Sequence, residues 1–420
     1  MQAVIVAAGE SSRFWPLNKK HKSLTSFFGK PLLYWTIKSL SDKGISDIIV
    51  VMSPESSLDK DISFAASELG VTLSFVVQDK PLGTGDAIYR AKDMVRGLFL
   101  VSWPYKVNIG EVLEKITEKQ KGEEKPVLVC VPTDNPSDYG ILRFKEDKVA
   151  EIVENPKEGA EPSKTKISGT YLLDADFFEC YKSLPKHHPE DFVDALNAYL
   201  KKREVLFAIM EDALPSLKYP WDLLKISKFM FSGKLNNYIA PSATIGKNAL
   251  ISDNVYIGEN VVIGDNTIIS DDCYIGDNCK IGPNNVLRGP VVLEKDVLTG
   301  SFMEIKNSII QEGTHFHSGY IGDSVVGQNC RFGAGFITAN RRVDRENIKS
   351  IIKGSKVDTG LTYFGCVVGD NSKFGIHSGT MPGVLIGSDC LVGPGTLVFE
   401  NLEDKTTFYS EFKNHKEVRK

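Results

Sequence analysis

A glycine-containing loop follows the first apolar run of the chain and carries two cations further along. The run Ala3–Ala7 leads into Ala8 and Gly9, and Arg13 and Lys22 follow. Glycine lets the backbone approach a phosphate chain, whose oxygens backbone N–H groups can cradle. Arginine and lysine would neutralise the charge that builds on a triphosphate during nucleotidyl transfer. The pattern therefore indicates a phosphate-binding loop, and a plain strand–turn–helix corner is the alternative reading.

The first half of the chain alternates apolar runs with helix-like segments. The expected strands are Ala3–Ala7, Ser46–Met52, Leu73–Val77 and Leu98–Val101, and the expected helices are Pro31–Leu40, Asp59–Leu69 and Asp86–Met94. This order favours a Rossmann-like α/β domain on a mainly parallel sheet. Open α/β folds bind ligands at the carboxyl edge of the sheet, which is where the loop at Gly9 falls.

From Ile239 onward, small apolar residues recur at every sixth position. The series is Ile245, Ile251, Ile257, Ile263, Ile269, Ile275, Ile281, Leu287 and Leu293, and it resumes at Val368, Phe374, Thr380, Ile386, Val392 and Val398. Neither a helix nor simple strand alternation sustains a period of six, whereas a coil of three short strands per turn does. The period predicts a parallel β-helix of the hexapeptide type. The charged segment Arg341–Lys356 has no such pattern and must leave the coil.

These patterns divide the chain into four expected parts. They are an α/β domain over residues 1–228, a linker helix over 229–238, the coil over 239–399 and a charged tail over 400–420. The linker is placed there because Lys225–Asn237 is typical of a connecting helix.

Composition narrows the class of protein. A net charge of −4 gives no reason to expect a nucleic-acid or membrane partner, and no apolar run approaches the roughly 20 residues of a membrane span. Seven cysteines without any C-x-x-C argue against a disulfide framework or a zinc site. The N-terminus has no basic region ahead of an apolar one. We therefore expect a cytoplasmic protein.

Several segments of the first half resemble the sugar-1-phosphate nucleotidylyltransferases. The loop with Arg13 and Lys22 is similar to their signature, with Ser11, Ser12 and His21 where that family usually has Gly, Thr and Pro. The resemblance implies that Ala8 and Gly9 bind the nucleotide, and that Arg13 and Lys22 are catalytic. The stretch QDKPLGTGDA at 78–87 resembles the base-reading segment. It implies that Gln78 and Thr84 hydrogen-bond a pyrimidine and that Gly83 leaves room for the ring.

Further segments resemble the sugar-binding strands and the metal-binding motif of that family. Asp138-Tyr139-Gly140 and Glu154-Asn155-Pro156-Lys157 are similar to its sugar-side strands. The resemblance implies that Gly140 and Glu154 bind the sugar and that Lys157 meets a phosphate; alone, Glu154 and Lys157 would read as a solvated pair. Tyr219-Pro220-Trp221-Asp222 resembles an archaeal motif in which the Asp helps to bind Mg²⁺, a hard ion that suits a carboxylate oxygen.

One departure affects the metal site. The family usually carries Gly-Asp after the strand that matches Leu98–Val101, and that Asp is the other metal ligand. This chain reads Ser102-Trp103-Pro104-Tyr105, and the next carboxylate is Glu111. An Asn that often lies two residues before Gly169 is replaced by Ile167. Three outcomes are open for the first half of the chain. It could catalyse nucleotidyl transfer slowly, it could use water or another carboxylate as the metal ligand, or it could bind a nucleotide-sugar without turnover.

The coil resembles the acetyltransferase half of the bifunctional N-acetylglucosamine-1-phosphate uridyltransferase / glucosamine-1-phosphate acetyltransferase family, in an archaeal-like form. The matching residues are Arg288, Glu304, Lys306, His317, Tyr320, Gly333-Ala334-Gly335, Asn340 and Lys349. The resemblance implies a left-handed coil, a homotrimer, and acetyl-CoA as co-substrate bound near Ala334. It also implies that His317 is the catalytic base and that Arg288, Lys306, Tyr320, Asn340 and Lys349 bind the sugar phosphate.

The implied chemistry is coherent, because only a neutral amine attacks a thioester and a base must take its proton. Imidazole changes its charge near neutral pH and suits that role. Counting in sixes from Ile305 places His317 on an inward position, but the repeat restarts at Ile321, so the register breaks beside His317. A broken register favours a functional site. Arg331 stands where the family has an acceptor-binding Asn, and its guanidinium cannot accept a hydrogen bond.

Three hypotheses follow for the whole chain. The favoured one is a bifunctional enzyme: acetyl-CoA acetylates an amino-sugar 1-phosphate in the coil, and the first half joins the product to UTP or dTTP with Mg²⁺, giving a nucleotide-sugar such as UDP-N-acetylglucosamine. The second is an acetyltransferase with a non-catalytic, nucleotide-sugar-binding first half, which Trp103 favours. The third is a regulatory or structural trimer without turnover.

Overall fold

The computed structural model describes residues 1–420 except 147, 212–215, 233–234, 236 and 419–420. Two compact units can be distinguished. The first comprises residues 1–10, 23–25 and 30–216, and the second comprises 11–22, 26–29 and 217–420. No helix among the described residues is long and apolar enough to cross a membrane.

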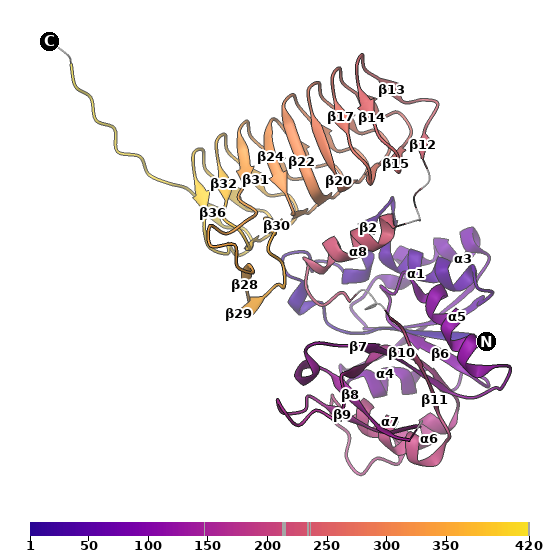
Figure 1. The fold of residues 1–420 in the computed structure, drawn as a ribbon. Coiled ribbons are helices and arrows are strands. Elements are labelled where there is room, and N and C mark those ends of the chain that lie inside the picture. The colour runs from indigo at the N-terminus through magenta and orange to yellow at the C-terminus, as the bar shows by residue number, and fades with distance from the viewer. Residues whose placement is uncertain (147, 212–215, 233–234, 236, 419–420) are drawn as a thin grey trace. The chain divides into compact units, whose positions relative to one another are not determined.

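The first unit is a three-layer α/β fold built on one sheet, and it confirms the expected fold class (Figure 1). Its strands are β1 (Gln2–Ala7), β4 (Asp47–Met52), β5 (Thr72–Val77), β6 (Phe99–Ser102), β7 (Val127–Pro132), β8 (Gly140–Lys145), β9 (Lys148–Glu154), β10 (Thr165–Leu173) and β11 (Leu206–Ile209). Its α-helices are α1 (Leu32–Ser41), α2 (Leu58–Ile62), α3 (Phe64–Leu69), α4 (Thr84–Arg90), α5 (Ile109–Gln120), α6 (Asp176–Lys182) and α7 (Phe192–Lys202). Two further short strands are β2 (Ser26–Phe27), which belongs to the second unit, and β3 (Lys30–Pro31), which belongs to the first.

The strand order explains where ligand-binding residues gather. The order is β11-β7-β10-β6-β1-β4-β5, and β1 pairs in parallel with both β4 and β6. Only β10 runs antiparallel within this path. The carboxyl ends of β1 and β6 therefore lie at the same edge, so the loop after Ala7 and the segment after Ser102 emerge side by side. The expected helix over 59–69 is divided into α2 and α3 at Ser63.

The second unit is a left-handed β-helix whose flat faces are stacks of parallel strands. Its first strands are β12 (Tyr238–Ile239), β13 (Thr244–Ile245), β14 (Leu250–Ile251), β15 (Val255–Ile257), β16 (Val262–Ile263), β17 (Ile268–Ile269), β18 (Cys273–Ile275), β19 (Lys280–Ile281) and β20 (Val286–Leu293). Then come β21 (Leu298–Thr299), β22 (Met303–Ile310), β23 (His315–Phe316), β24 (Gly319–Gly322), β25 (Val325–Val326), β26 (Arg331–Phe332) and β27 (Phe336–Thr338). The last are β30 (Cys366–Val368), β31 (Lys373–Phe374), β32 (Gly379–Thr380), β33 (Val384–Ile386), β34 (Leu391–Val392), β35 (Leu397–Val398) and β36 (Thr407–Phe408).

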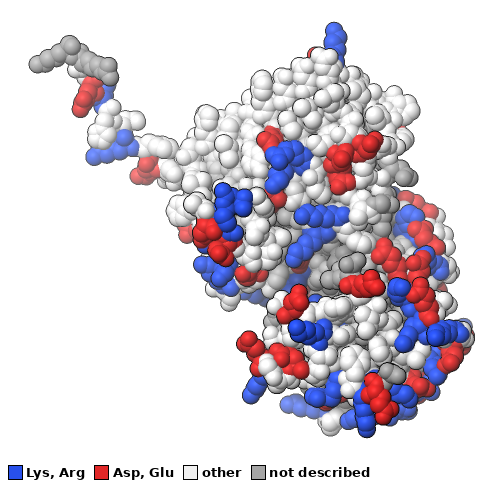
Figure 2. Space-filling model, in the orientation of Figure 1, with Lys and Arg blue, Asp and Glu red and all other residues white. Residues whose placement is uncertain are grey.

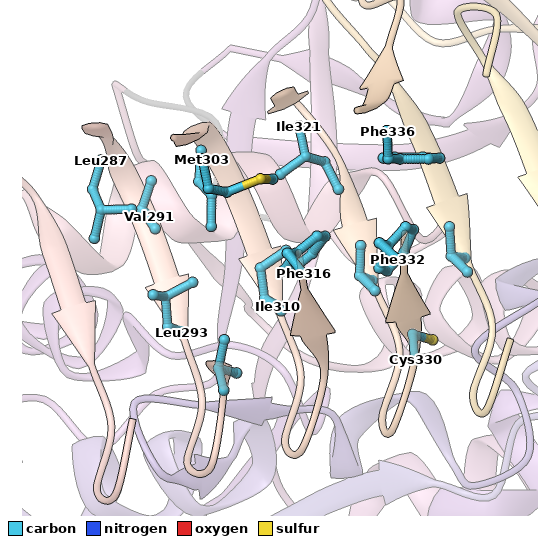
Figure 3. Packing of buried hydrophobic residues seen from close by; sticks show 14 of the residues in the cluster. Leu287, Val291, Leu293, Met303, Ile310, Phe316, Ile321, Cys330, Phe332 and Phe336 are labelled. Atoms are coloured by element: carbon cyan, nitrogen blue, oxygen red, sulfur yellow. The ribbon is translucent and has the colours of Figure 1, made fainter. Parts of the chain in front are cut away.

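The period of six places one apolar side chain per strand in the interior of the coil. Ile257 pairs with Ile275, eighteen positions later, and Ile275 pairs with Leu293. All three are fully buried. Figure 3 shows the same inward stacking for residues such as Phe316 and Phe332, whose ring centroids are 4.6 Å apart. Burial of these ladders is the main stabilisation of a fold whose strands are only two or three residues long.

Two expected boundaries differ from the structure. The connecting helix is α8 (Asp222–Phe231), so it begins before the expected 229–238, and residues 233, 234 and 236 of that range lie outside the described residues. Helical geometry is lost at Ser232, whose ψ is 89°. The coil continues past residue 399, because β36 pairs with β34 and Leu402 bridges to Ile386. The expected tail is therefore shorter than 400–420.

The charged segment after β27 leaves the coil, as expected. It folds into the antiparallel hairpin β28 (Lys349–Ile352) and β29 (Ser355–Asp358), and the coil resumes at β30. Figure 2 shows that acidic and basic side chains are interspersed on the viewed face.

Glu294 is a buried carboxyl in the coil and gives a prediction about stability. It is 2% exposed, accepts a hydrogen bond from Gly29 N at 3.0 Å, and its Oε1 has no partner among the described residues. Burial raises the pKa of Glu294 to about 8, and the Gly29 and Phe28 N–H groups act against this. The folded state thus holds this proton more tightly than the unfolded chain does. Its contribution to stability is greatest below the unfolded pKa near 4.5 and is lost as pH rises through about 8.

Glu294→Gln removes the ionisable group and retains an oxygen acceptor for Gly29. We expect the variant to lose less stability than the unaltered protein between pH 5 and pH 9, by on the order of 2–4 kcal/mol. Thermal or denaturant unfolding at both pH values measures this difference. Glu400→Gln, at an exposed glutamate, is the control. Identical pH profiles for the Glu294→Gln variant and the unaltered protein would contradict the assignment.

Candidate functional site

In the first unit, the base-reading segment is held in place by its own hydrogen bonds. Gln78, 4% exposed, follows β5 and donates from Nε2 to Gly83 O at 3.0 Å and to Asp86 Oδ2 at 2.9 Å. Both amide hydrogens are thereby used, so Oε1 is the atom left to accept a hydrogen bond. Thr84 begins α4, whose N-terminus faces the same segment. The arrangement suits a base that offers an N–H donor.

Gly83 is required for a reason that the sequence did not reveal. Its φ is 103°, and a Cβ on this residue would lie 2.1 Å from Pro189 O. Backbone from the segment before α7 therefore packs directly on the base-reading segment. The expected role of leaving room for the nucleotide ring stays a prediction, and this close packing is an independent structural need for glycine.

The sugar side of the first unit is a pocket of about 270 Å³ that contains Gly140, Glu154 and Trp103. Gly140 pairs with Glu154 across β8 and β9, and a Cβ on Gly140 would lie 2.6 Å from Glu154 Oε2. Burial, and secondarily the charge of Glu190, raises the pKa of Glu154. Lys157 lies beyond the end of β9 and does not line this pocket. The expected roles of Glu154 toward the sugar and of Lys157 toward a phosphate stay predictions.

Trp103 stands in the segment where the resemblance expects a metal-binding carboxylate, and it lines the sugar-side pocket. Its indole lies against Gly169, since a Cβ on that glycine would be 2.2 Å from Trp103 Nε1. Ile167 also lines the pocket. Buried Lys106 contributes to the same wall, and burial followed by the charge of Lys166 lowers its pKa to about 7. Sequence reasoning did not identify Lys106, which follows the turn after Trp103, or Lys166, which lies on β10, because no motif in the sequence marks either lysine.

Arg13, Lys22 and Asp222 belong to the second unit. Lys22 Nζ donates to Leu217 O at 2.6 Å. Burial lowers the pKa of Lys22 to about 8, the charge of Asp222 opposes this, and that of Arg13 adds to it. Lys22 is thus close enough to both Asp222 and Arg13 for their charges to act on it, and the expected role of Arg13 and Lys22 at a triphosphate stays a prediction. Ala8 and Gly9 directly follow β1, at the carboxyl edge of the sheet.

Asp222 is 8% exposed and starts α8. Its Oδ2 accepts hydrogen bonds from the Lys218 and Tyr219 N–H groups, both at 2.8 Å. Burial raises its pKa, and these N–H groups and the charges of Lys225 and Lys22 act in the opposite direction. Oδ1 remains for a metal. The described residues contain no group of three or more His, Cys, Asp and Glu that could hold an ion. A single carboxylate oxygen suits a hard ion such as Mg²⁺ where substrate phosphates supply other ligands.

In the coil, the matched polar residues form one network on adjacent strands. Arg288 on β20 pairs in register with Lys306 on β22, and Glu304 pairs with Tyr320 on β24. Arg288 forms a 2.6 Å ion pair with Glu304. Parallel strands of the coil therefore bring side chains separated by sixteen to eighteen residues onto one face.

Asp323 is the centre of this network, and sequence reasoning assigned it no role. It is 2% exposed and accepts from Lys306 Nζ at 3.2 Å, from Asn307 Nδ2 at 2.6 Å and from Asn340 Nδ2 at 2.6 Å. Asn340 also donates to Tyr320 Oη at 2.9 Å. Asp323 directly follows the Tyr320-Ile321-Gly322 motif, and that position was the available signal. A buried carboxylate with three donors fixes their orientation.

His317 is exposed, so the inward reading of this residue is excluded. The coil shortens here: Thr299 pairs with Phe316, seventeen positions later, and Phe316 pairs with Phe332 after sixteen. Phe316 consequently takes the inward position and is 1% exposed. His317 lies at the following corner and lines a pocket with His315 and Arg331. The expectation that the register break beside His317 marks a functional site stays a prediction.

The guanidinium of Arg331 is bound to backbone carbonyl groups of the coil. Its Nη1 donates to Gly313 O at 2.6 Å and to Cys330 O at 2.9 Å. Burial, followed by the charge of Arg331, lowers the pKa of neighbouring His315.

Lys349 lies in a different pocket, together with Arg341 and Arg342. Ala334 lies in the turn after β26, where its carbonyl accepts from His377 N at 2.8 Å.

The chain matches two family models. One is the nucleotidyl transferase family, over residues 2–222, and the other is the bacterial transferase hexapeptide family, over 242–272 and 254–289. "Bifunctional protein GlmU" of Methanococcus vannielii is 33% identical over 98% of each chain. The corresponding protein of Methanocaldococcus jannaschii is 31% identical over 97% of each. A "Bifunctional sugar-1-phosphate nucleotidylyltransferase/acetyltransferase" of Sulfurisphaera tokodaii is 30% identical over 98% of this chain and 99% of that protein.

Proposed function

Since the chain belongs to the bifunctional sugar-1-phosphate nucleotidylyltransferase/acetyltransferase family, we propose that it makes a nucleotide-sugar in two steps. It is an enzyme that combines sugar-phosphate nucleotidyl transfer with acetyl transfer. In the first step, acetyl-CoA acetylates an amino-sugar 1-phosphate in the coil. In the second, the product attacks UTP or dTTP and releases pyrophosphate. The product class is that of UDP-N-acetylglucosamine.

The polar network around Asp323 is the observation that supports acetyl transfer most directly. The coil does not need this network for stability, because a largely buried ion pair such as Lys306–Asp323 often costs as much in desolvation as it returns in attraction. Arg288 and Lys306 would hold the sugar phosphate, while Tyr320 and Asn340 orient the acceptor. His317 would take the ammonium proton, leaving a neutral amine to attack the thioester carbonyl, and CoA would leave as the thiol. Ala334 is proposed to lie beside bound acetyl-CoA, and Lys349 is proposed to bind the sugar phosphate.

The pyrimidine preference rests on the orientation of Gln78. Because its amide hydrogens are engaged by Gly83 and Asp86, its oxygen would accept from the base. Uracil and thymine offer an N3–H at that edge, and a cytosine offers none there. Gly140 and Glu154 would bind the sugar, with Lys157 outside the pocket. Ala8 and Gly9 would approach the phosphates through their backbone, while Arg13 and Lys22 neutralise charge on the triphosphate.

Mg²⁺ is proposed as the metal of nucleotidyl transfer, with Asp222 as its protein ligand. Bound there, the ion would neutralise the developing charge on the phosphates. Acetyl-CoA is the proposed co-substrate of the coil. The proposed location is the cytoplasm, and no nucleic-acid or membrane partner is proposed.

A homotrimer through the coil is proposed as the assembly. Ile337 and Leu397 are 55% and 49% exposed, and both pair with Gly379 on one face of the coil. Phe399, the residue after β35, is 67% exposed. Exposed apolar residues in such a row mark an interaction surface. A monomeric mass in solution would contradict this proposal.

A pair of assays on the purified protein with Mg²⁺ tests the proposed function. The first follows CoA thiol release from acetyl-CoA with glucosamine 1-phosphate or galactosamine 1-phosphate. The second follows pyrophosphate release from UTP or dTTP with N-acetylglucosamine 1-phosphate. Activity in both is expected. Thiol release alone would support the second hypothesis, in which Trp103 has made the first half a binding domain, and silence in both would contradict the proposal.

A further inference from the structure

The helix that precedes the coil contributes a cationic wall to a pocket on the coil's outer face. Helix α8 packs against β20 and β22 within the second unit. A pocket of about 350 Å³ is lined by Lys225 and Lys228 of this helix, by Lys306 and Asn307 of β22, and by Tyr363. The two helix lysines are three residues apart, so they project from one face of α8.

The charge of this pocket is not balanced by the protein. Asp323 also lines it, but this carboxylate is already bound by Lys306 and by two Asn amides. Lys225 and Lys228 are exposed, and within the described chain no carboxylate is in ion-pair contact with either. Asp222, one turn earlier on the helix, interacts with Lys225 only at longer range. Two ammonium groups therefore lie beside a neutral Lys306–Asp323 pair, which favours an anionic ligand.

The other walls restrict what that anion can be. Lys306 Nζ lies 4.5 Å from the centre of the Tyr363 ring, and Arg341 donates to Tyr363 Oη at 2.6 Å. Tyr363 is thus fixed over Lys306. Asn307 has a φ of 42° in the left-handed region, and its buried Oδ1 has no partner among the described residues. Positive φ is common at Asn residues in the turns of this coil, so the signal at Asn307, which lines the pocket, is its amide oxygen, which can accept a hydrogen bond from a ligand.

We propose that Lys225 and Lys228 bind the phosphate of the amino-sugar acceptor together with Lys306. This inference rests on the proposed acetyl transfer and extends its site to a helix outside the coil. Three ammonium groups around one small pocket suit a phosphate monoester, whose charge is close to −2 at neutral pH. The acceptor phosphate is favoured over the phosphates of CoA because Lys306, with Arg288 beside it in register, belongs to the acceptor side of the network.

The double variant Lys225→Ala/Lys228→Ala tests this inference on the whole enzyme. We expect KM for glucosamine 1-phosphate to rise about 10-fold or more, with KM for acetyl-CoA unchanged. Lys225→Arg/Lys228→Arg keeps both charges and should retain most of the affinity. Lys280→Ala, at an exposed lysine on β19, is the matched control and should change neither constant. An increase in KM for acetyl-CoA alone, or no change in either KM, would overturn the assignment.

A second measurement does not depend on turnover. Lysines of the unaltered protein are reductively methylated with and without glucosamine 1-phosphate, and the modified positions are identified by mass spectrometry. Protection of Lys225 and Lys228, but not of Lys280, is expected. Inorganic phosphate should protect the same pair at higher concentration. Protection in a protein that shows no acetyl transfer would leave this site standing and refute the proposed reaction, whereas an active enzyme without protection would refute the site.

Discussion

Replacing His317 by alanine is expected to lower kcat for CoA thiol release by about 10²–10⁴-fold, the usual effect of removing a general base. His317 is exposed at a corner of the coil and lines a pocket, so the variant should fold normally. Without imidazole, the ammonium of the acceptor would lose its proton only to water. The thiol-release assay measures the loss, and pyrophosphate release from the same preparation should be unchanged.

His315 provides a matched control two residues away. It lines the same pocket and lies on β23, whereas His317 lies at the corner that follows this strand. His315→Ala should therefore retain most of the acetyl-transfer activity. If His315→Ala abolished thiol release and His317→Ala did not, the base would have been assigned to the wrong imidazole.

Asp222→Asn is expected to lower nucleotidyl transfer by about 100-fold, because the charge stabilisation that a catalytic metal supplies is worth several kcal/mol. Asparagine retains an oxygen that can accept from the Lys218 and Tyr219 N–H groups, so the start of α8 should persist. The requirement for Mg²⁺ should shift to higher concentration. Pyrophosphate release across a Mg²⁺ titration measures both effects, and thiol release reports that the coil is intact.

Glu111→Gln distinguishes Asp222 from another carboxylate as the ligand. Glu111 is the first carboxylate after Trp103 in sequence, and it lies exposed in the first turn of α5. We expect Glu111→Gln to leave the Mg²⁺ dependence unaltered. Unchanged nucleotidyl transfer in Asp222→Asn, combined with a loss in Glu111→Gln, would move the metal site to α5.

Periodic features of this protein could be predicted from the sequence. The recurrence of six, from Ile245 to Leu293, specifies a coil because each buried residue depends only on its neighbours one strand and one turn away. Buried runs such as Ala3–Ala7 likewise predicted the central strands of the sheet. The motif residues Arg288, Lys306, Tyr320 and Asn340 were found because their spacing matches that of a known family, and the register of β20, β22 and β24 places them together.

What the sequence alone determined is therefore local or periodic, while long-range contacts were decided by the tertiary structure. Asp323 became the centre of the coil network only when three strands placed its donors around it. The shortened turns that expose His317, and the packing of Pro189 against Gly83, each join residues far apart along the chain. Lys225 and Lys228 appear in sequence as ordinary solvated lysines. Their place beside Lys306 follows from how α8 packs on β20 and β22, which no spacing within the helix encodes.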